Sequence, residues 1–494
     1  MYQKLFATQS IADLQKRARP EATSRGSLSI LSLTALGVGA TIGTGIFVLT
    51  GTAAAHHAGP ALVISFVIAG IGCALAALCY AEFAAMIPVS GSAYSYAYAT
   101  LGELVAWFIG WNLVLEYLFA VSTVSVGWSG YVVSLLAQYG VNLPHTLVGA
   151  PLERGSGPLG FVRTGDYINL PAIIIVLVIG GICYGGIRQS SLINSIIVAI
   201  KVTVVAVFIL FGACYFVPAN WHPFLPPNNG SFGEYGYSGV LAASGIIFFA
   251  YIGFDAVSTC AQEARRPQRD MPLAILSSLG ICTALYIATA AVLTGMVNYR
   301  KLDVAAPVAL ALDTYPQLSW FAGPLKIGIL AGMSSVMLVL TLAQSRIFLA
   351  MARDGLLPQW FARVHPRSNT PTAATVTTVV GAVIVGGLFP IRLLGEVVSI
   401  GTLTAFVSVC LGVLVLRKTK PELARPFRTP LPWFTCLGGA LVCGGMMLAL
   451  PRDTWLRLGV WTAIGLLVYG FYGYRRSRLR VPVVASAPRV AVRL

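Results

Sequence analysis

Residues 37–47 read GVGATIGTGIF, which places four glycines within nine residues of a long apolar run. Each glycine in a helix interior costs about 1 kcal/mol relative to alanine, so this stretch favours unwinding. Non-helical backbone within a membrane is tolerated only where protein buries it or where it lines a cavity. The stretch therefore predicts a discontinuous membrane helix, whose freed N–H groups face an anion and whose freed carbonyl groups face a cation.

Close packing of two helices is the alternative interpretation of these glycines. Gly39 and Gly43 are four residues apart, a spacing that lets helix backbones approach each other. Gly37 and Gly45 add an odd spacing that spreads the glycines around the helix instead of along one face, which favours unwinding.

A second interruption occurs at residues 248–255, FFAYIGFD, where a glycine and an acid lie in an aromatic-rich run. Interruptions at corresponding positions of two halves of a chain indicate a binding site where two structural repeats meet. The sequence therefore predicts one site between the two interruptions.

Apolar runs recur along the whole chain. Of its 494 residues, 57% are hydrophobic and 10% charged, against roughly 45–50% and about 25% in soluble domains. A helix needs about 20 apolar residues to cross a bilayer. We therefore predict an all-α polytopic membrane protein. Its twelve expected spans are residues 28–55, 60–87, 103–136, 168–187, 190–216, 237–262, 271–297, 321–350, 372–389, 393–416, 431–450 and 456–474.

Basic residues are distributed unevenly between the expected loops. With the N-terminus inside, the cytoplasmic segments hold 24 of the 33 Lys and Arg residues, the outer segments hold 8, and Lys201 lies within a span. This bias predicts cytoplasmic termini in the cytoplasmic membrane, and it accounts for the net charge of +16 without nucleic acid. Residues 1–27 are expected to form a cytoplasmic segment with an amphipathic helix, and residues 475–494 a basic cytoplasmic tail.

Glu116 lies in the middle of the third expected span. An acid at that depth is costly and faces the bundle interior or a water-filled cavity. The functional interpretation is an acid of a substrate pocket. The alternative is a buried glutamate, protonated or hydrogen-bonded, that fixes helix packing.

Lys201 is about the twelfth residue of the fifth expected span, about 18 Å deep, which is too far for its side chain to reach the headgroups. A lysine removed from water can take up and release a proton near physiological pH. The functional interpretation is therefore proton coupling. The alternative is a permanently charged lysine paired with an acid or with backbone carbonyl groups.

The sequence offers no pattern for a metal or an organic cofactor. The nine cysteines lie in or beside apolar runs without a CxxC pair, and the five histidines show no metal-ligand spacing. We therefore expect no metal and no cofactor.

The chain resembles the amino acid–polyamine–organocation (APC) superfamily, and most closely the bacterial relatives of the cationic amino acid transporter family. The matching segments are GVGATIGTGIF at 37–47, PVSGSAYSYAY at 88–98, WNLVLEY at 111–117, the Lys201 segment, FFAYIGFDAVSTCAQEARRPQRDMP at 248–272 and RIFLAMARDGLLP at 346–358. The resemblance implies a LeuT-like fold of two inverted five-helix repeats, 28–216 and 237–416, followed by two helices in 431–474.

The resemblance also implies a substrate site at the unwound helices. The substrate carboxylate would meet backbone N–H groups around Gly43, Thr44 and Gly45, with Ile42 and Ile46 beside them. The ammonium group would meet carbonyl groups near Thr41, Phe249, Ala250 and Ile252. By the same resemblance, Glu116 lies near the pocket, and the Lys201 ammonium group replaces a coupling sodium ion, which implies proton coupling.

The eighth span offers candidate residues for a side-chain pocket, Met333, Ser334 and Met337. A pocket lined by methionine favours small or medium apolar side chains. The resemblance itself leaves neutral and cationic amino acids open.

These observations predict a proton-coupled amino acid importer that works by alternating access. The alternatives are an exchanger of amino acids or amines without net proton movement and a non-transporting receptor. An enzyme is disfavoured, because the sequence offers no paired catalytic carboxylates and no nucleophile–base pair. The expected partners are the amino acid and the lipid bilayer; a small accessory membrane subunit and the oligomeric state stay open.

Overall fold

The computed structural model describes residues 7–10, 28–87, 92–155, 161–186, 191–255, 257–258, 264–365 and 370–479. The amphipathic helix expected within residues 1–27 lies outside the described residues, and so does the basic tail beyond residue 479.

Helices make up most of the described chain. The α-helices are α3 (Ile30–Thr41), α4 (Thr50–Ala53), α5 (Leu62–Met86), α6 (Ser92–Thr100), α7 (Glu103–Gln138), α8 (Leu170–Gly185), α9 (Ser191–Ala213), α10 (Gly236–Ile247), α11 (Pro267–Met296), α12 (Pro307–Asp313), α13 (Ser319–Arg353), α14 (Thr372–Leu388), α15 (Ile391–Thr419), α16 (Pro432–Leu448), α17 (Arg452–Val468) and α18 (Tyr474–Arg476).

Shorter helices of other types join or extend them. The π-helices are η1 (Gly45–Leu49), η2 (Ala54–Ala58) and η12 (Tyr469–Gly473). The 3₁₀-helices are η3 (Gly59–Ala61), η4 (His145–Leu147), η6 (Pro218–Trp221), η7 (Phe248–Tyr251), η9 (Tyr299–Lys301), η10 (Pro316–Leu318) and η11 (Gln359–Ala362). Strands β1 (Leu152–Arg154) and β2 (Phe161–Arg163) pair antiparallel in one of the expected outer loops.

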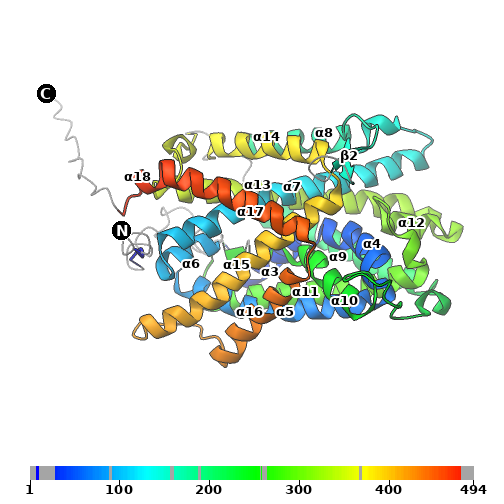
Figure 1. The fold of residues 1–494 in the computed structure, drawn as a ribbon. Coiled ribbons are helices and arrows are strands. Elements are labelled where there is room, and N and C mark those ends of the chain that lie inside the picture. Colours follow the sequence, from blue (N-terminus) through cyan, green and yellow to red (C-terminus); the bar gives the residue numbers. More distant parts are fainter. Residues whose placement is uncertain are drawn as a thin grey trace.

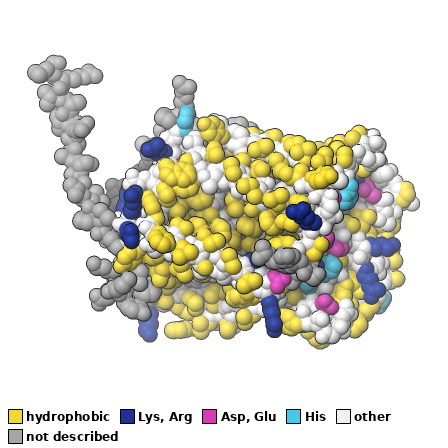
Figure 2. All heavy atoms as spheres, turned by 45° about the horizontal axis from the view of Figure 1, so that its top comes forward, with side chains coloured by type: hydrophobic (Ala, Val, Ile, Leu, Met, Phe, Trp, Pro, Cys, Tyr) yellow, Lys and Arg dark blue, Asp and Glu magenta, His cyan; other side chains and the backbone are white. Residues whose placement is uncertain are grey.

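The helices agree with the predicted class of protein. Seven helical stretches of the described chain are long and apolar enough to cross a membrane, and five shorter apolar helices of 10–17 residues accompany them. Each of the twelve predicted apolar stretches contains one of these helices or part of one. Hydrophobic side chains cover most of the surface in Figure 2, and charged ones gather toward the two ends of the molecule. The chain is therefore a polytopic helical membrane protein.

The helices run side by side along the long axis of the bundle (Figure 1). Helices α8 and α14 pack together along one edge, while α5 and α16 pack together along the opposite edge. Helix α7 packs against α13 and α15, and α3 packs against α9 and α11. Helices α3, α7 and α13, which carry five of the predicted site residues, thus pack against several other helices of the bundle.

The two described ends of the chain meet at the start of α7. The backbone N–H of Glu103 donates to the Ala7 carbonyl at 3.0 Å. The buried carboxylate of Glu103 accepts hydrogen bonds from the hydroxyl groups of Tyr469, at 2.7 Å, and of Ser477. Ala7 and Ser477 therefore lie at the same end of the bundle.

A buried carboxylate holds two helices together at that end. Glu82, near the end of α5, is only 2% exposed. It forms an ion pair with Arg417 of α15 at 2.5 Å and a second with Arg425 at 3.4 Å, and it accepts the Thr429 N–H at 2.8 Å. Glu82 thus joins α5 to α15 and to the segment that follows α15.

Replacing Glu82 with glutamine should destabilise the protein strongly. The change leaves two arginines without their anion, and breaking a buried ion pair costs roughly 3–5 kcal/mol. We expect thermal unfolding of the detergent-solubilised chain at a clearly lower temperature than wild type. Glu422→Gln, at an exposed position, is the matched control and should unfold like wild type. Equal unfolding temperatures for the two variants would contradict the assigned role of Glu82.

Candidate functional site

The first glycine-rich stretch breaks a helix, as its sequence predicts. Helix α3 ends at Thr41, and Ile42 takes an extended conformation with φ −73° and ψ 102°. The chain resumes as the π-helix η1 from Gly45. The first N–H groups of a helix have no partner within that helix, so η1 presents such groups at the break.

The second interruption also breaks a helix. Helix α10 ends at Ile247 and tightens into the 3₁₀-helix η7, after which Ile252 is extended. Gly253 has a positive φ of 122°, and a Cβ atom there would lie 2.7 Å from the carbonyl group of Ala40. Only glycine fits this conformation and this close approach of two backbones.

The two breaks touch each other. A Cβ atom on Gly45 would lie 2.3 Å from Cα and 2.8 Å from the backbone N of Ala250. The structure therefore brings the predicted residues of the first break, 41–46, against those of the second, 249–252, and buries both sets.

Tyr286 of α11, which no sequence motif singles out, links the two breaks. Its hydroxyl group lies 2.8 Å from the Thr41 carbonyl and 2.9 Å from the Ala250 carbonyl. In the sequence, Tyr286 stands out only as a tyrosine within an apolar run, and the hydroxyl group of a buried tyrosine needs a hydrogen-bond partner. Two carbonyl groups expected near the ammonium group thus share a neutral hydroxyl donor.

Lys201 of α9 lies beside the first break. Its side chain is buried, and its Nζ donates a hydrogen bond to the Gly39 carbonyl in the last turn of α3. Gly332 of α13 leaves room for it, because a Cβ atom there would lie 3.1 Å from the lysine side chain. A lysine amine donates such a bond in either protonation state, so the contact is compatible with both interpretations of this residue.

Glu116 and the start of η1 lie at different levels along α7. Glu116 is eleven residues, about 16 Å along the helix, from Gly127, which contacts Thr44. Its carboxyl group is fully buried beside Thr402, whose hydroxyl donates instead to a backbone carbonyl at 3.0 Å. Among the described residues, none donates a hydrogen bond to the Glu116 carboxyl oxygens.

The second break reaches α7 through an acid. The carboxylate of Asp255 accepts the hydroxyl of Tyr117 at 2.8 Å and the N–H of Gly253 at 3.2 Å. Helix α7 therefore passes the second break at the level of Tyr117, the neighbour of Glu116.

The candidate pocket residues of α13 do not all face the same way. Val336, which is not among the residues predicted from the sequence, faces the first break, since a Cβ on Gly43 would lie 3.1 Å from its methyl group. Met333 and Met337 are buried on the same helical face, three residues before and one after Val336. Ser334 instead accepts the indole N–H of Trp128 of α7 at 3.1 Å.

Two adjacent helix breaks inside a polytopic bundle are typical of secondary transporters, which bind substrate and coupling ion at such breaks. Comparison with known proteins makes the assignment specific. The family model described as "Amino acid permease" matches residues 28–469, so the chain belongs to this family of transporters, which are not enzymes.

Individual relatives cover nearly the whole chain. The chain is 45% identical to the methylthioribose transporter of Bacillus subtilis (strain 168) over 475 residues, 96% of this chain and 99% of the relative. It is also 45% identical to the branched-chain amino acid permease BcaP of the same organism, over 96% of this chain and 99% of the relative. Human cationic amino acid transporter 4 is 38% identical over 81% of this chain and 61% of its own. The predicted relationship to the APC superfamily is confirmed.

Proposed function

We propose that this protein imports a neutral, apolar amino acid together with a proton by alternating access. The observation that carries the proposal is the contact between Gly45 and Ala250. It brings the N–H groups at the start of η1 close to the carbonyl groups at the end of η7. Helix N-termini favour anions and freed carbonyl groups favour cations, so this pair of breaks suits a zwitterion.

We also propose the helix arrangement and the membrane orientation that the sequence predicts. The helices of 28–216 and 237–416 form two inverted five-helix repeats, those of 431–474 add two more, and both termini are cytoplasmic. The meeting of both described chain ends at Glu103 supports an even number of spans.

An apolar side chain is the preferred substrate feature. Met333, Val336 and Met337 offer an apolar face of α13 beside the first break, and methionine adapts to aliphatic shapes. The branched-chain amino acid permease among the relatives agrees with this preference. Leucine, isoleucine and valine are therefore the first candidates.

Lys201 is proposed to carry the coupled proton. Its amine contacts the Gly39 carbonyl, two residues before α3 ends. A change in the charge of this amine alters its interaction with α3, whose end forms the first break. Proton transfer at Lys201 would thereby be linked to the conformation of the substrate site.

Methylthioribose is the second candidate substrate. The identity to the methylthioribose transporter equals that to the branched-chain permease, over the same share of the chain. The side chains of Met333 and Met337 are flexible and polarizable, so they also suit the thioether group of this compound.

Uptake into proteoliposomes tests the proposal. We expect labelled L-leucine to accumulate when the vesicle interior is alkaline and a protonophore to abolish the accumulation. Unlabelled isoleucine should compete, while arginine and methylthioribose should not. Uptake that requires internal amino acid and ignores the pH gradient would establish an exchanger, and binding without flux would establish a receptor. Competition by methylthioribose but not by isoleucine would favour the second candidate.

A further inference from the structure

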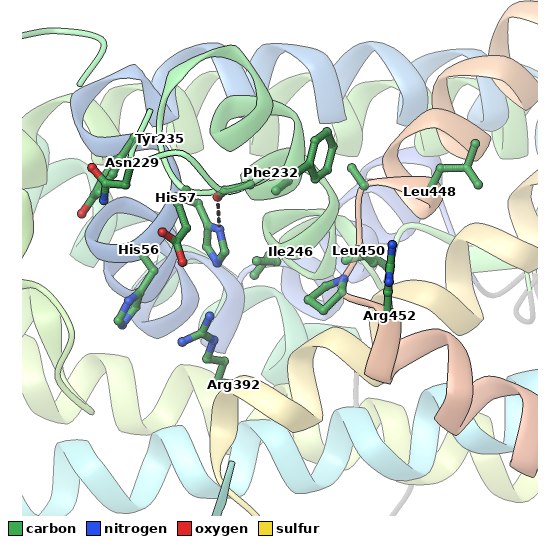
Figure 3. Close-up of a pocket in the computed structure, with 15 residues that line it drawn as sticks. His56, His57, Asn229, Phe232, Tyr235, Ile246, Arg392, Leu448, Leu450 and Arg452 are labelled. Atoms are coloured by element: carbon green, nitrogen blue, oxygen red, sulfur yellow. Dashed lines mark hydrogen bonds between the residues drawn. The ribbon is translucent and has the colours of Figure 1, made fainter. Parts of the chain in front are cut away.

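A cavity of about 710 Å³ lies between the loop before α10 and the first turns of α15 and α17 (Figure 3). We call it the polar pocket. Its lining includes His57, Glu234, Ala242, Ile246, Arg392 and Arg452. Its volume falls in the range of roughly 300–1,000 Å³ that small-molecule sites occupy.

One wall is a tightly hydrogen-bonded loop that carries Glu234. The side-chain amide of Asn228 donates to the carbonyl groups of Ser231 and Glu234, both at 2.9 Å. The imidazole Nδ1 of His57, in η2, lies 2.7 Å from the Gly233 carbonyl. These bonds fix the backbone at Glu234, whose side chain is exposed at the pocket.

The first turns of α15 and α17 contribute Arg392 and Arg452, which line different sides of the pocket (Figure 3). Glu396, 2% exposed, lies 3.6 Å from Arg392 and accepts the Thr454 hydroxyl at 2.9 Å. Arg457 reaches the same carboxylate at 3.8 Å but does not line the pocket. Glu396 therefore joins the two helices and holds Arg392 at the pocket wall.

The other acid nearby is already paired. Asp303 forms a hydrogen bond with His56 at 2.7 Å, and this bond holds the pKa of the Asp303 carboxyl below its ordinary value. Glu234 and Arg392 are thus charges of opposite sign that the pocket offers a ligand.

The part of the pocket nearest to the second break is formed by Ala242 and Ile246 of α10. Ala250 lies four residues after Ile246, about 6 Å along the helix axis. Between the two levels, Ser399 of α15 donates to the Ile246 carbonyl at 3.3 Å, which ties α15 to α10.

We propose that the polar pocket is a second, weaker docking site for the zwitterionic amino acid, in which Arg392 binds its carboxylate and Glu234 its ammonium group. The inference rests on the proposed function. It means that the substrate binds at the polar pocket before it reaches the two breaks. Two charges of opposite sign in one pocket suit a zwitterion, whereas Glu234 repels a plain anion.

Equilibrium binding of labelled L-leucine to the detergent-solubilised full chain tests the inference. Wild type should bind two molecules per chain, one of them more weakly. Arg392→Gln and, separately, Glu234→Gln should weaken the weaker site by about tenfold, since each removes a charge-assisted hydrogen bond. In proteoliposomes the KM for uptake should rise with an unchanged maximal rate. Arg457→Gln is the matched control, because Arg457 shares Glu396 but lies outside the pocket.

Three outcomes would overturn the inference while uptake by wild type remains. The first is a single binding site in wild type. The second is an equal effect of Arg392→Gln and Arg457→Gln, which would show a structural role of the Glu396 cluster. The third is displacement of leucine from the weaker site by inorganic phosphate but not by L-alanine, which would show a plain anion site. If wild type neither binds nor takes up L-leucine, the proposed function fails instead.

Discussion

Gly45→Ala should reduce L-leucine uptake by roughly two orders of magnitude. The added Cβ would lie 2.3 Å from Cα of Ala250, so it meets backbone and not a flexible side chain. Either the two breaks separate or the surrounding helices shift. Overpacking of this kind costs about 1–3 kcal/mol, and the upper value corresponds to roughly a hundredfold change in an equilibrium. The measurement is initial uptake in proteoliposomes, normalised to the amount of correctly folded protein.

The control for this prediction is a glycine without neighbours. A Cβ on Gly181 of α8 meets no heavy atom within 4 Å, so Gly181→Ala should transport like wild type. Adding Ala250→Gly to the Gly45 variant should not restore uptake, because Cα of residue 250 remains in place. Wild-type uptake by Gly45→Ala would show that contact between the breaks is not needed for transport.

The positions of the helices and of their breaks could be predicted because both depend on local sequence. Bilayer thickness sets the length of an apolar run, and the helix penalty of glycine marks where the run unwinds. Both breaks accordingly occur within the predicted stretches, 37–47 and 248–255. The short helices α6 and α12 and the pair β1–β2 lie between the expected spans, where the hydrophobic pattern carries no information.

Contacts between distant segments could not be predicted in the same way. Tyr286 reaches both breaks only because α11 packs against α3. Ser334 has the right depth for the pocket but faces Trp128 instead. Lys326 lies within α13 with a fully buried side chain and pairs at 2.9 Å with Asp313, a partner that its place in the sequence does not reveal. Depth along a span follows from sequence, whereas the facing partner depends on how the helices are rotated and packed.

Lys201→Ala should abolish proton-driven accumulation while leaving exchange intact. If one proton accompanies each substrate, a gradient of one pH unit supplies about 1.4 kcal/mol and sustains roughly tenfold accumulation. Without an amine at residue 201, the accumulation ratio of L-leucine should fall to about one, the value expected without coupling. Counterflow of labelled against unlabelled leucine needs no net proton movement, so its persistence would show that the variant still folds and binds substrate.

The matched control is the second buried lysine of the described helices, because it separates loss of a charge from loss of coupling. Lys326→Met removes a buried ammonium group as well, but one that is paired with Asp313 and remote from the Gly39 carbonyl that Lys201 contacts. This variant should be less stable yet keep the wild-type accumulation ratio. A tenfold ratio in Lys201→Ala would show that the proton travels by another group, and an equal loss in both variants would show that any buried lysine is required for folding. Only a loss of accumulation that is confined to the Lys201→Ala variant links the coupled proton to the amine beside the first break.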